Sequence, residues 1–190
     1  MKVVHVKNET QRDACLARLC AEVYGHEAGI APLATFAGTL SVLVAQEAAR
    51  VLALIDNESR PIALALLVLD ELGESMEVAL LTSLGSESVD QPAERLVGEL
   101  ALKAPLRVNA HDDAQEKMFR ECGIKRWFDG PNGMRIGVGP RHAAAELDDI
   151  PRTMRFDQRA VIQAFKQDKS IFEGYKQRFI RGLESFPAVL

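Results

Sequence analysis

The feature that most constrains the fold of this chain is a change of hydrophobic period at Val51. From there three apolar runs follow one another, VLALID, IALALLVLD and MEVALLTSL, separated by DNESRP and ELGES. Runs of this length, rich in branched side chains and bounded by turn residues, are typical of β-strands. The segment from Val51 to Leu84 is therefore predicted to form a three-stranded antiparallel meander.

The residues before the meander predict one strand and two helices. Met1 to Val6 is rich in valine, and Asn8 followed by Gln11 has the pattern of a capping box at a helix start. That helix is expected to stop at Gly25, where glycine can take a left-handed conformation. Pro32 is suited to the first turn of a second helix, which is expected to reach about Ala49.

The residues after the meander alternate between the two periods as far as Val138. Helices are predicted for Asp90 to Lys103 and Asp112 to Cys122, with a strand at Leu106 to Ala110 between them. A terminal hairpin is expected around the turn DGPNG. The fold class is thus α/β (α+β), a mixed, mostly antiparallel sheet flanked by helices. Its core is expected to contain Ile62, Leu64, Leu66, Val78, Leu80, Leu96, Leu100 and Phe119.

The composition of the chain changes near Gly139, which predicts a domain at residues 1–139 and a helical C-terminal extension at 140–190. In the extension, a short helix is expected at Ala143 to Asp149 and a single long helix from Asp157 to Ser185. The long helix carries an apolar stripe of Val161, Phe165, Phe172, Tyr175, Phe179 and Leu183. A stripe of this size needs cover, either from the sheet domain or from a second copy of the chain in a homodimer.

Charge and composition exclude several classes of function. The net charge is −4, with no block of lysine and arginine, so no nucleic-acid partner is expected. The first residues soon turn polar, and the longest apolar run is far below the ~20 residues that cross a bilayer, so a cytoplasmic protein without a membrane partner is expected. An odd number of cysteines without a CxxC pair fits a reducing compartment. The four histidines lie far apart, and no metal site is predicted.

The segment Ala114 to Ile124 has a distinctive pattern, in which Met118 and Phe119 form a pair on a helix and Gly123 and Ile124 open the next strand. Together with the order of elements over residues 1–139, this pattern resembles the GNAT superfamily of acetyl-CoA-dependent N-acyltransferases. The resemblance implies that acetyl-CoA, or another acyl-CoA, binds in the sheet and that a small-molecule or peptide amine attacks its thioester directly.

The resemblance also implies site residues. Glu77 would border the acyl site and deprotonate the amine, and His111, where the family often has asparagine, would serve as acid or base. A solvated strand position for Glu77 and a capping or solvent-facing role for His111 are the structural alternatives. Cofactor contacts are expected from the strand end and the loop that follows it, together with the helix: Leu81, Thr82, Ser83, Leu84, Gly85, Ser86 and Phe119.

Two positions depart from the family pattern. The loop GSESVDQPAE has one glycine and no cation before Arg95, and it places Glu87, Asp90 and Glu94 where phosphates would bind. Phe119 replaces a tyrosine whose hydroxyl protonates the leaving thiolate in the family. Cys122 could be a proton donor, but an interior thiol on a helix is far more often a packing residue. A GNAT-like domain without catalysis, which acts as a binding or interaction module, is therefore the second hypothesis, and an unrelated α+β fold is the third.

Overall fold

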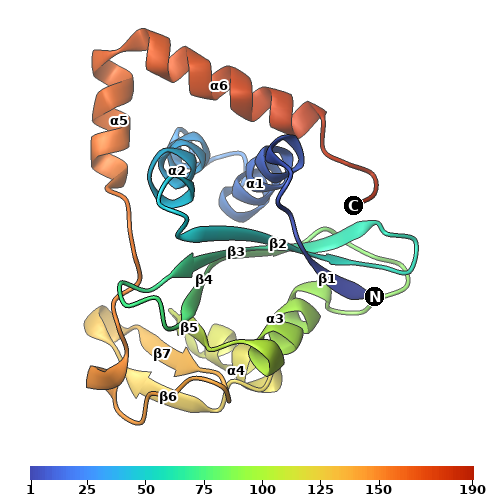
Figure 1. The fold of residues 1–190 in the computed structure, drawn as a ribbon, viewed down its shortest axis with the longest axis vertical. Helices are drawn as coiled ribbons and strands as arrows, with labels where there is room; N and C mark the ends of the chain where they lie inside the picture. The colour runs from blue at the N-terminus through green and yellow to red at the C-terminus, as the bar shows by residue number, and fades with distance from the viewer.

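A computed structural model describes residues 1–190, and its centre is a seven-stranded sheet in the order β1-β2-β3-β4-β5-β7-β6 (Figure 1). The strands are β1 (Lys2–His5), β2 (Ala49–Ile55), β3 (Pro61–Leu69), β4 (Met76–Ser83), β5 (Leu106–Ala110), β6 (Arg126–Asp129) and β7 (Arg135–Val138). Every neighbouring pair is antiparallel except β4 and β5, which run parallel. The predicted meander is confirmed as β2, β3 and β4, and the mixed, mostly antiparallel sheet is confirmed with it.

Helices cover both faces of the sheet. They are α1 (Glu9–Tyr24), α2 (Ala31–Gly38) with a π-helical continuation (Thr39–Val44), α3 (Pro92–Lys103), α4 (Asp113–Glu121), α5 (Gln158–Gln167) and α6 (Lys169–Glu184). The predicted cap of the first helix is present, because the Asn8 side chain accepts a hydrogen bond from the Gln11 backbone N–H at 3.0 Å. The second helical segment ends at Val44 instead of Ala49, since β2 already begins at Ala49.

The core forms two layers because side chains alternate across the central strands. Val51, Leu64 and Leu66 pack with Leu16, Leu19 and Phe36 on the side of α1 and α2. Leu52, Leu54 and Leu67 pack with Leu96, Leu100 and Phe119 on the side of α3 and α4. Covering of both faces explains why the central strands read as nearly continuous apolar runs.

Two predicted core residues are only half-buried. Val78 and Leu80 both lie on β4, whose burial is intermediate along most of its length. The other six residues of the predicted core are buried. The prediction was wrong for β4 because a strand that loses one neighbour also loses the side chains that would cover its edge.

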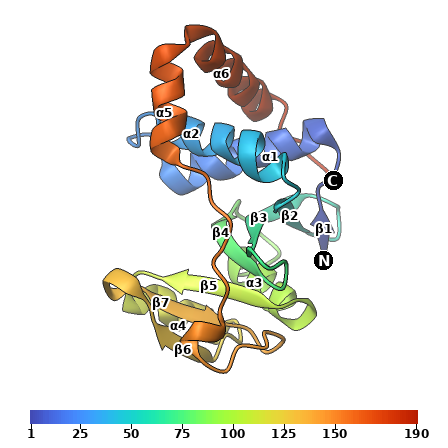
Figure 2. The same cartoon turned by 60° about the vertical axis from the view of Figure 1, so that its left-hand side comes forward.

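The C-terminal extension forms a third layer on the outer side of α1 and α2 (Figures 1 and 2). The prediction of one long helix was wrong. Asp168 adopts an extended conformation, and its carboxylate accepts from the backbone N–H groups of Ser170 and Ile171, so it ends α5 and caps α6. The short helix expected from Ala143 is reduced to a 3₁₀ turn at Leu147–Asp149.

The apolar stripe of the extension is covered within the chain. Phe179 meets Phe36 edge to face at 5.3 Å between ring centroids, and Phe165 packs on Ala34 and Ala37. Gly182 lies where α6 crosses α1, and a Cβ there would come within 3.0 Å of the Ala17 side chain. The Arg178 guanidinium donates to the Asp13 carboxylate at 2.6 Å. This stripe therefore needs no second copy of the chain, and both dimerisation and the domain boundary at Gly139 stay predictions.

No helix of the structure combines the length and the apolar character needed to span a bilayer. The last residue lies beside the sheet, where the backbone N–H of Leu190 donates to the carbonyl of Ser59, in the turn between β2 and β3, at 2.8 Å.

The docking of α6 generates the first prediction. Phe179→Ala should lower the free energy of unfolding by about 2 kcal/mol, less than for a fully buried phenylalanine, because its ring is partly exposed. Ile180→Ala, at an exposed neighbouring position, is the matched control and should change it by less than about 0.5 kcal/mol. Urea unfolding of both variants makes the comparison, and equal stabilities would show that α6 is not docked.

Candidate active site

The sheet parts between its two parallel strands. Met76 and Glu77 of β4 pair with Leu106 and Arg107 of β5, and no later residue of either strand continues the pairing. Figure 2 shows β5 turning away from β4 beyond this point. Because the paired residues lie at the starts of both strands, the gap opens toward their carboxyl ends. The edge of β4 from Val78 onward thus faces no strand on that side.

The register of β3 and β4 shifts at the same place. Leu66 pairs with Leu80 and Leu67 with Val78, so Ala79 is an extra residue on β4. A bulge of this kind bends the strand that carries it and increases its twist. The extra residue therefore lies two positions beyond Glu77, the last β4 residue that pairs with β5, and the bulge contributes to the divergence of the two strands.

Glu77 lies at the apex of the gap, within a polar network. Its Oε1 accepts from Asn109 Nδ2 at 2.8 Å and from Thr153 Oγ1 at 3.1 Å, and it lies 3.4 Å from Arg107 Nε. The side chains of Arg107 and Glu77 are only 9% and 14% exposed. Burial lowers the pKa of Arg107, and the charge of Glu77 acts against that shift. No hydrogen bond engages Oε2, so the carboxylate keeps one oxygen for a further partner.

A cavity of about 240 Å³ lies beside Glu77, between β4, α2 and residues 153–158. Its lining contains Thr39, whose fully buried Oγ1 has no hydrogen-bond partner, and Thr35, whose hydroxyl donates to the Tyr24 hydroxyl at 3.0 Å. A buried hydroxyl without a partner is costly, and its position in this wall favours a polar ligand. We call this space the acceptor cavity.

Residues 151–156 lie between β7 and α5, and Thr153 to Phe156 form one wall of this cavity. They are fixed to the turn between β3 and β4, because Glu71 N donates to Arg152 O at 2.8 Å and Met154 N donates to Leu69 O at 3.0 Å. The Phe156 ring lies so close to Gly38 that a Cβ there would come within 2.2 Å of it. The connection is thus held in a fixed position as a wall of the site.

His111 lies at the opposite end of the gap. It follows the last residue of β5, its side chain is exposed, and its backbone N–H donates to Gln115 Oε1 at 2.7 Å. It stands four residues beyond Arg107 along β5, or roughly 13 Å at the rise of a strand. The structure therefore does not bring the two predicted catalytic side chains, Glu77 and His111, together.

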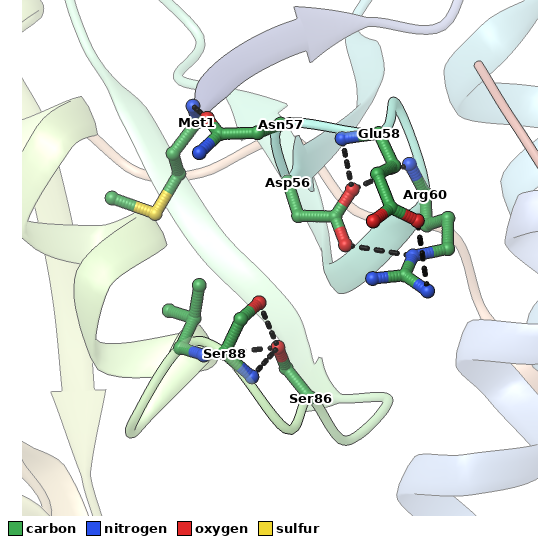
Figure 3. A network of polar contacts seen from close by, with 8 residues as sticks. Met1, Asp56, Asn57, Glu58, Arg60, Ser86 and Ser88 are labelled. Atoms are coloured by element: carbon green, nitrogen blue, oxygen red, sulfur yellow. Dashed lines mark hydrogen bonds and ion pairs between the residues drawn. The ribbon is translucent and has the colours of Figure 1, made fainter.

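The predicted cofactor loop, shown in Figure 3, uses serine hydroxyls to bind its own backbone amides. Ser86 Oγ accepts from the N–H groups of Ser88 at 3.2 Å and Val89 at 3.0 Å, and Ser83 Oγ accepts from Ala93 N, in the first turn of α3, at 3.0 Å. Pro92, at the start of α3, has no N–H to offer. Gly85 adopts φ +85°, with open space around it. Leu81, Thr82 and Leu84 lie along the same strand end and are half-buried.

A cation that the loop itself lacks comes from the turn between β2 and β3. Arg60 shares a cavity of about 440 Å³ with Gly85, Ser86 and Glu87. It already forms ion pairs with Asp56 at 2.8 Å and Glu58 at 3.1 Å (Figure 3). The backbone N–H of Arg60 also donates to Asp56, and this hydrogen bond is the largest factor that lowers the pKa of that carboxyl. One guanidinium thus faces the three carboxylates of Asp56, Glu58 and Glu87, so this region has a net negative charge. We call the loop after β4, together with this cavity, the phosphate corner.

Phe119 points into the core on the α3 and α4 side, where it is buried with its ring 6.5 Å from that of Trp127. Cys122 packs against the same cluster, and burial raises the pKa of its thiol to about 11. Cys15 and Cys20 are buried in α1.

Sequence reasoning missed Arg107, Asn109 and Thr153, the three partners of Glu77. A signal was present in β5, where Arg107 and Asn109 alternate with apolar residues and therefore share one face of the sheet. No local pattern marks Thr153, which reaches Glu77 only because the chain returns to β4 after the last strand.

The Glu77 network generates the second prediction. Glu77→Ala should cost about 3 kcal/mol of unfolding free energy, because it leaves the buried Arg107 guanidinium without its counter-charge. Arg107→Met in the same chain should restore part of that loss, and urea unfolding of the two single variants and the double variant measures the coupling. Additive effects would show that the two charges do not stabilise one another.

No protein-family model matches the sequence, and no curated protein is significantly similar to it. Among solved structures, aminoglycoside 6′-acetyltransferase type Ii superposes with a TM-score of 0.51 at 15% identity, over 74% of this chain and 97% of that one. The catalytic domain of Tetrahymena GCN5 histone acetyltransferase, in complex with coenzyme A, gives 0.47 at 15% identity, over 76% and 93%. The sheet order, the parting of β4 and β5 and the first of these superpositions agree: the chain has the fold of the GNAT acetyltransferases.

Proposed function

We propose that this protein is an N-acyltransferase, which transfers an acetyl or other acyl group from CoA to an amine. The observation that carries the proposal is the acceptor cavity, because it places a carboxylate and an unpartnered buried hydroxyl beside the gap between β4 and β5. The aminoglycoside acetyltransferase with the same fold acts on an amine-bearing substrate, as its name states.

In this proposal, Glu77 removes a proton from the amine. The hydrogen bonds from Asn109 and Thr153 and the ion pair with Arg107 hold Oε1 in place, so Oε2 is the oxygen that accepts the proton. Thr39 and the Tyr24–Thr35 pair orient the rest of the acceptor through hydrogen bonds. The loss of the proton leaves a lone pair on nitrogen for attack, which is the task of a general base.

Acyl-CoA would supply the activated thioester. The residues of the site suit its extended thioester arm better than its phosphates. The free edge of β4 from Val78 to Ser83 suits an extended arm that pairs with strand backbone, as added strands do. The loop after it suits phosphates poorly, because Ser83 and Ser86 already bind its amides and Glu87, Asp90 and Glu94 add negative charge. We therefore assign the thioester arm to the β4 edge, and the loop contributes little to binding of the phosphates.

The leaving thiolate needs a proton that Phe119 cannot give. Its ring has no acidic group and is packed in the core. Cys122 holds its proton at neutral pH and lies in the same apolar cluster, away from the network around Glu77. His111, at the open end of the gap, lies too far from Glu77 to protonate a thiolate that leaves there, so water is the proposed donor.

A module without catalysis is the second candidate function. It is favoured by the acidic phosphate corner and by the buried Phe119, both of which weaken a transferase. In that case the acceptor cavity would bind a ligand that is not modified. Measurements of turnover and of cofactor affinity separate the two functions.

Glu77→Gln tests the role of the carboxylate. The change keeps the shape of the side chain and removes its basicity, so thiol release from acetyl-CoA with a panel of amines should fall about 10²- to 10⁴-fold in kcat. Because the change also removes the counter-charge of Arg107, turnover is compared well below the melting temperature of the variant, where circular dichroism shows that it is folded, and Glu27→Gln, at an exposed position, is the control. An unchanged kcat would rule out Glu77 as the base.

Calorimetry with acetyl-CoA tests the phosphate corner. We expect weak binding by the wild-type protein and tighter binding by the triple variant Glu87→Gln, Asp90→Asn, Glu94→Gln, with a larger gain at low salt, where screening is least. The matched control neutralises three exposed carboxylates elsewhere, at Glu27, Glu47 and Asp148. If both triple variants bind alike, the phosphates lie outside this corner, and if no protein binds acetyl-CoA, the module is favoured.

A further inference from the structure

A second cavity lies next to the acceptor cavity, and three of its lining residues are arginines. It has a volume of about 450 Å³ and is lined by Arg107, Arg152 and Arg155, together with Glu71 and the β6–β7 connection at Pro131 and Met134. We call it the arginine cavity. It shares Thr153 and Arg155 with the acceptor cavity, so the connection to α5 separates the two spaces and borders both.

The charges of the arginine cavity do not cancel. Arg107 is neutralised by Glu77, whereas Arg152 and Arg155 take part in no ion pair and no side-chain hydrogen bond. The carboxylate of Glu71 forms no ion pair either, so one negative charge faces two unpaired positive ones. Other arginines are unpaired at the surface, but here two of them share a concave space in a chain of net charge −4.

The field of Arg155 reaches the buried network. Burial is the first cause of the lowered pKa of Arg107, and the positive charge of Arg155 adds to it. Repulsion between like charges at such a site is relieved by an anion, and guanidinium groups bind carboxylate and phosphate groups through paired hydrogen bonds.

We infer that the acyl acceptor is an amine that also carries an oxyanion, a carboxylate or a phosphate, which Arg152 and Arg155 bind while the amine lies at Glu77. The inference rests on the proposed acyl transfer. It follows from the shared wall, because Arg155 lines both cavities and its charge therefore also borders the space beside Glu77. The acceptor end of the site would thus attract negatively charged groups, whereas the phosphate corner at the other end repels them.

The experiment compares paired probes that differ only in the oxyanion. O-phosphoethanolamine is paired with ethanolamine, and 4-aminobutyrate with 4-aminobutanamide, so that the arms distinguish phosphate from carboxylate. Binding of each probe, and of inorganic phosphate, is measured by calorimetry at low ionic strength. Thiol release from acetyl-CoA gives KM for each amine.

The test variant is Arg152→Gln with Arg155→Gln, and the matched control is Arg159→Gln with Arg181→Gln, two exposed arginines outside both cavities. The test variant should bind the oxyanion probes about tenfold more weakly, as expected for the loss of charge-assisted hydrogen bonds at a solvent-accessible site. Its KM for the neutral amines and its affinity for acetyl-CoA should stay at wild-type values, as should every value of the control variant.

Three results would overturn the inference. The first is that the oxyanion probes bind no better than their neutral partners. The second is that the test and control variants lose the same affinity for the oxyanion probes, because the effect would then come from net charge alone. A parallel loss of acetyl-CoA affinity in the test variant would assign the arginines to the phosphates of the cofactor. Arginine-dependent oxyanion binding without thiol release from any amine would instead refute the acyl transfer and leave the oxyanion site in place.

Discussion

The ion pair between Glu77 and Arg107 stands at the one place where the two halves of the sheet meet through parallel strands. Beyond it β4 and β5 separate, so both charges lie at the edge of an opening and yet are almost completely buried. A buried charge is tolerated only with its partner and its hydrogen bonds, and Asn109 and Thr153 supply these. The opening of the sheet and the polar network therefore depend on each other.

Thr153 ties the C-terminal extension to this network. The extension leaves the last strand, passes the turn between β3 and β4, places Phe156 against Gly38 and then covers α1 and α2 with α5 and α6. Apolar contacts and the Arg178–Asp13 ion pair fix the helices of the extension to the rest of the chain. The residues that border both cavities are thus held at both ends, which gives the acceptor side of the site walls of fixed shape.

The two ends of the proposed site differ in electrostatic character. The loop at Ser83 to Asp90 binds its own amides with serine hydroxyls and is surrounded by carboxylates, with Arg60 as its single cation. The arginine cavity has the opposite sign. Helix starts and free backbone amides attract anions only when other groups leave them available. The contrast separates a weak phosphate corner from an acceptor side suited to negative charge.

The sequence by itself determined the strands and most helices, because period, caps and turn residues are local signals. It also determined the acidic loop, the place of Phe119 and the presence of Glu77 on β4. Only the tertiary structure decided that β4 and β5 part after Glu77, which left Val78 and Leu80 half-buried, and that Asp168 divides the final helix. It alone brought Arg60 to the loop and Thr153 to Glu77, since contacts between residues far apart in the chain leave no periodic trace in the sequence.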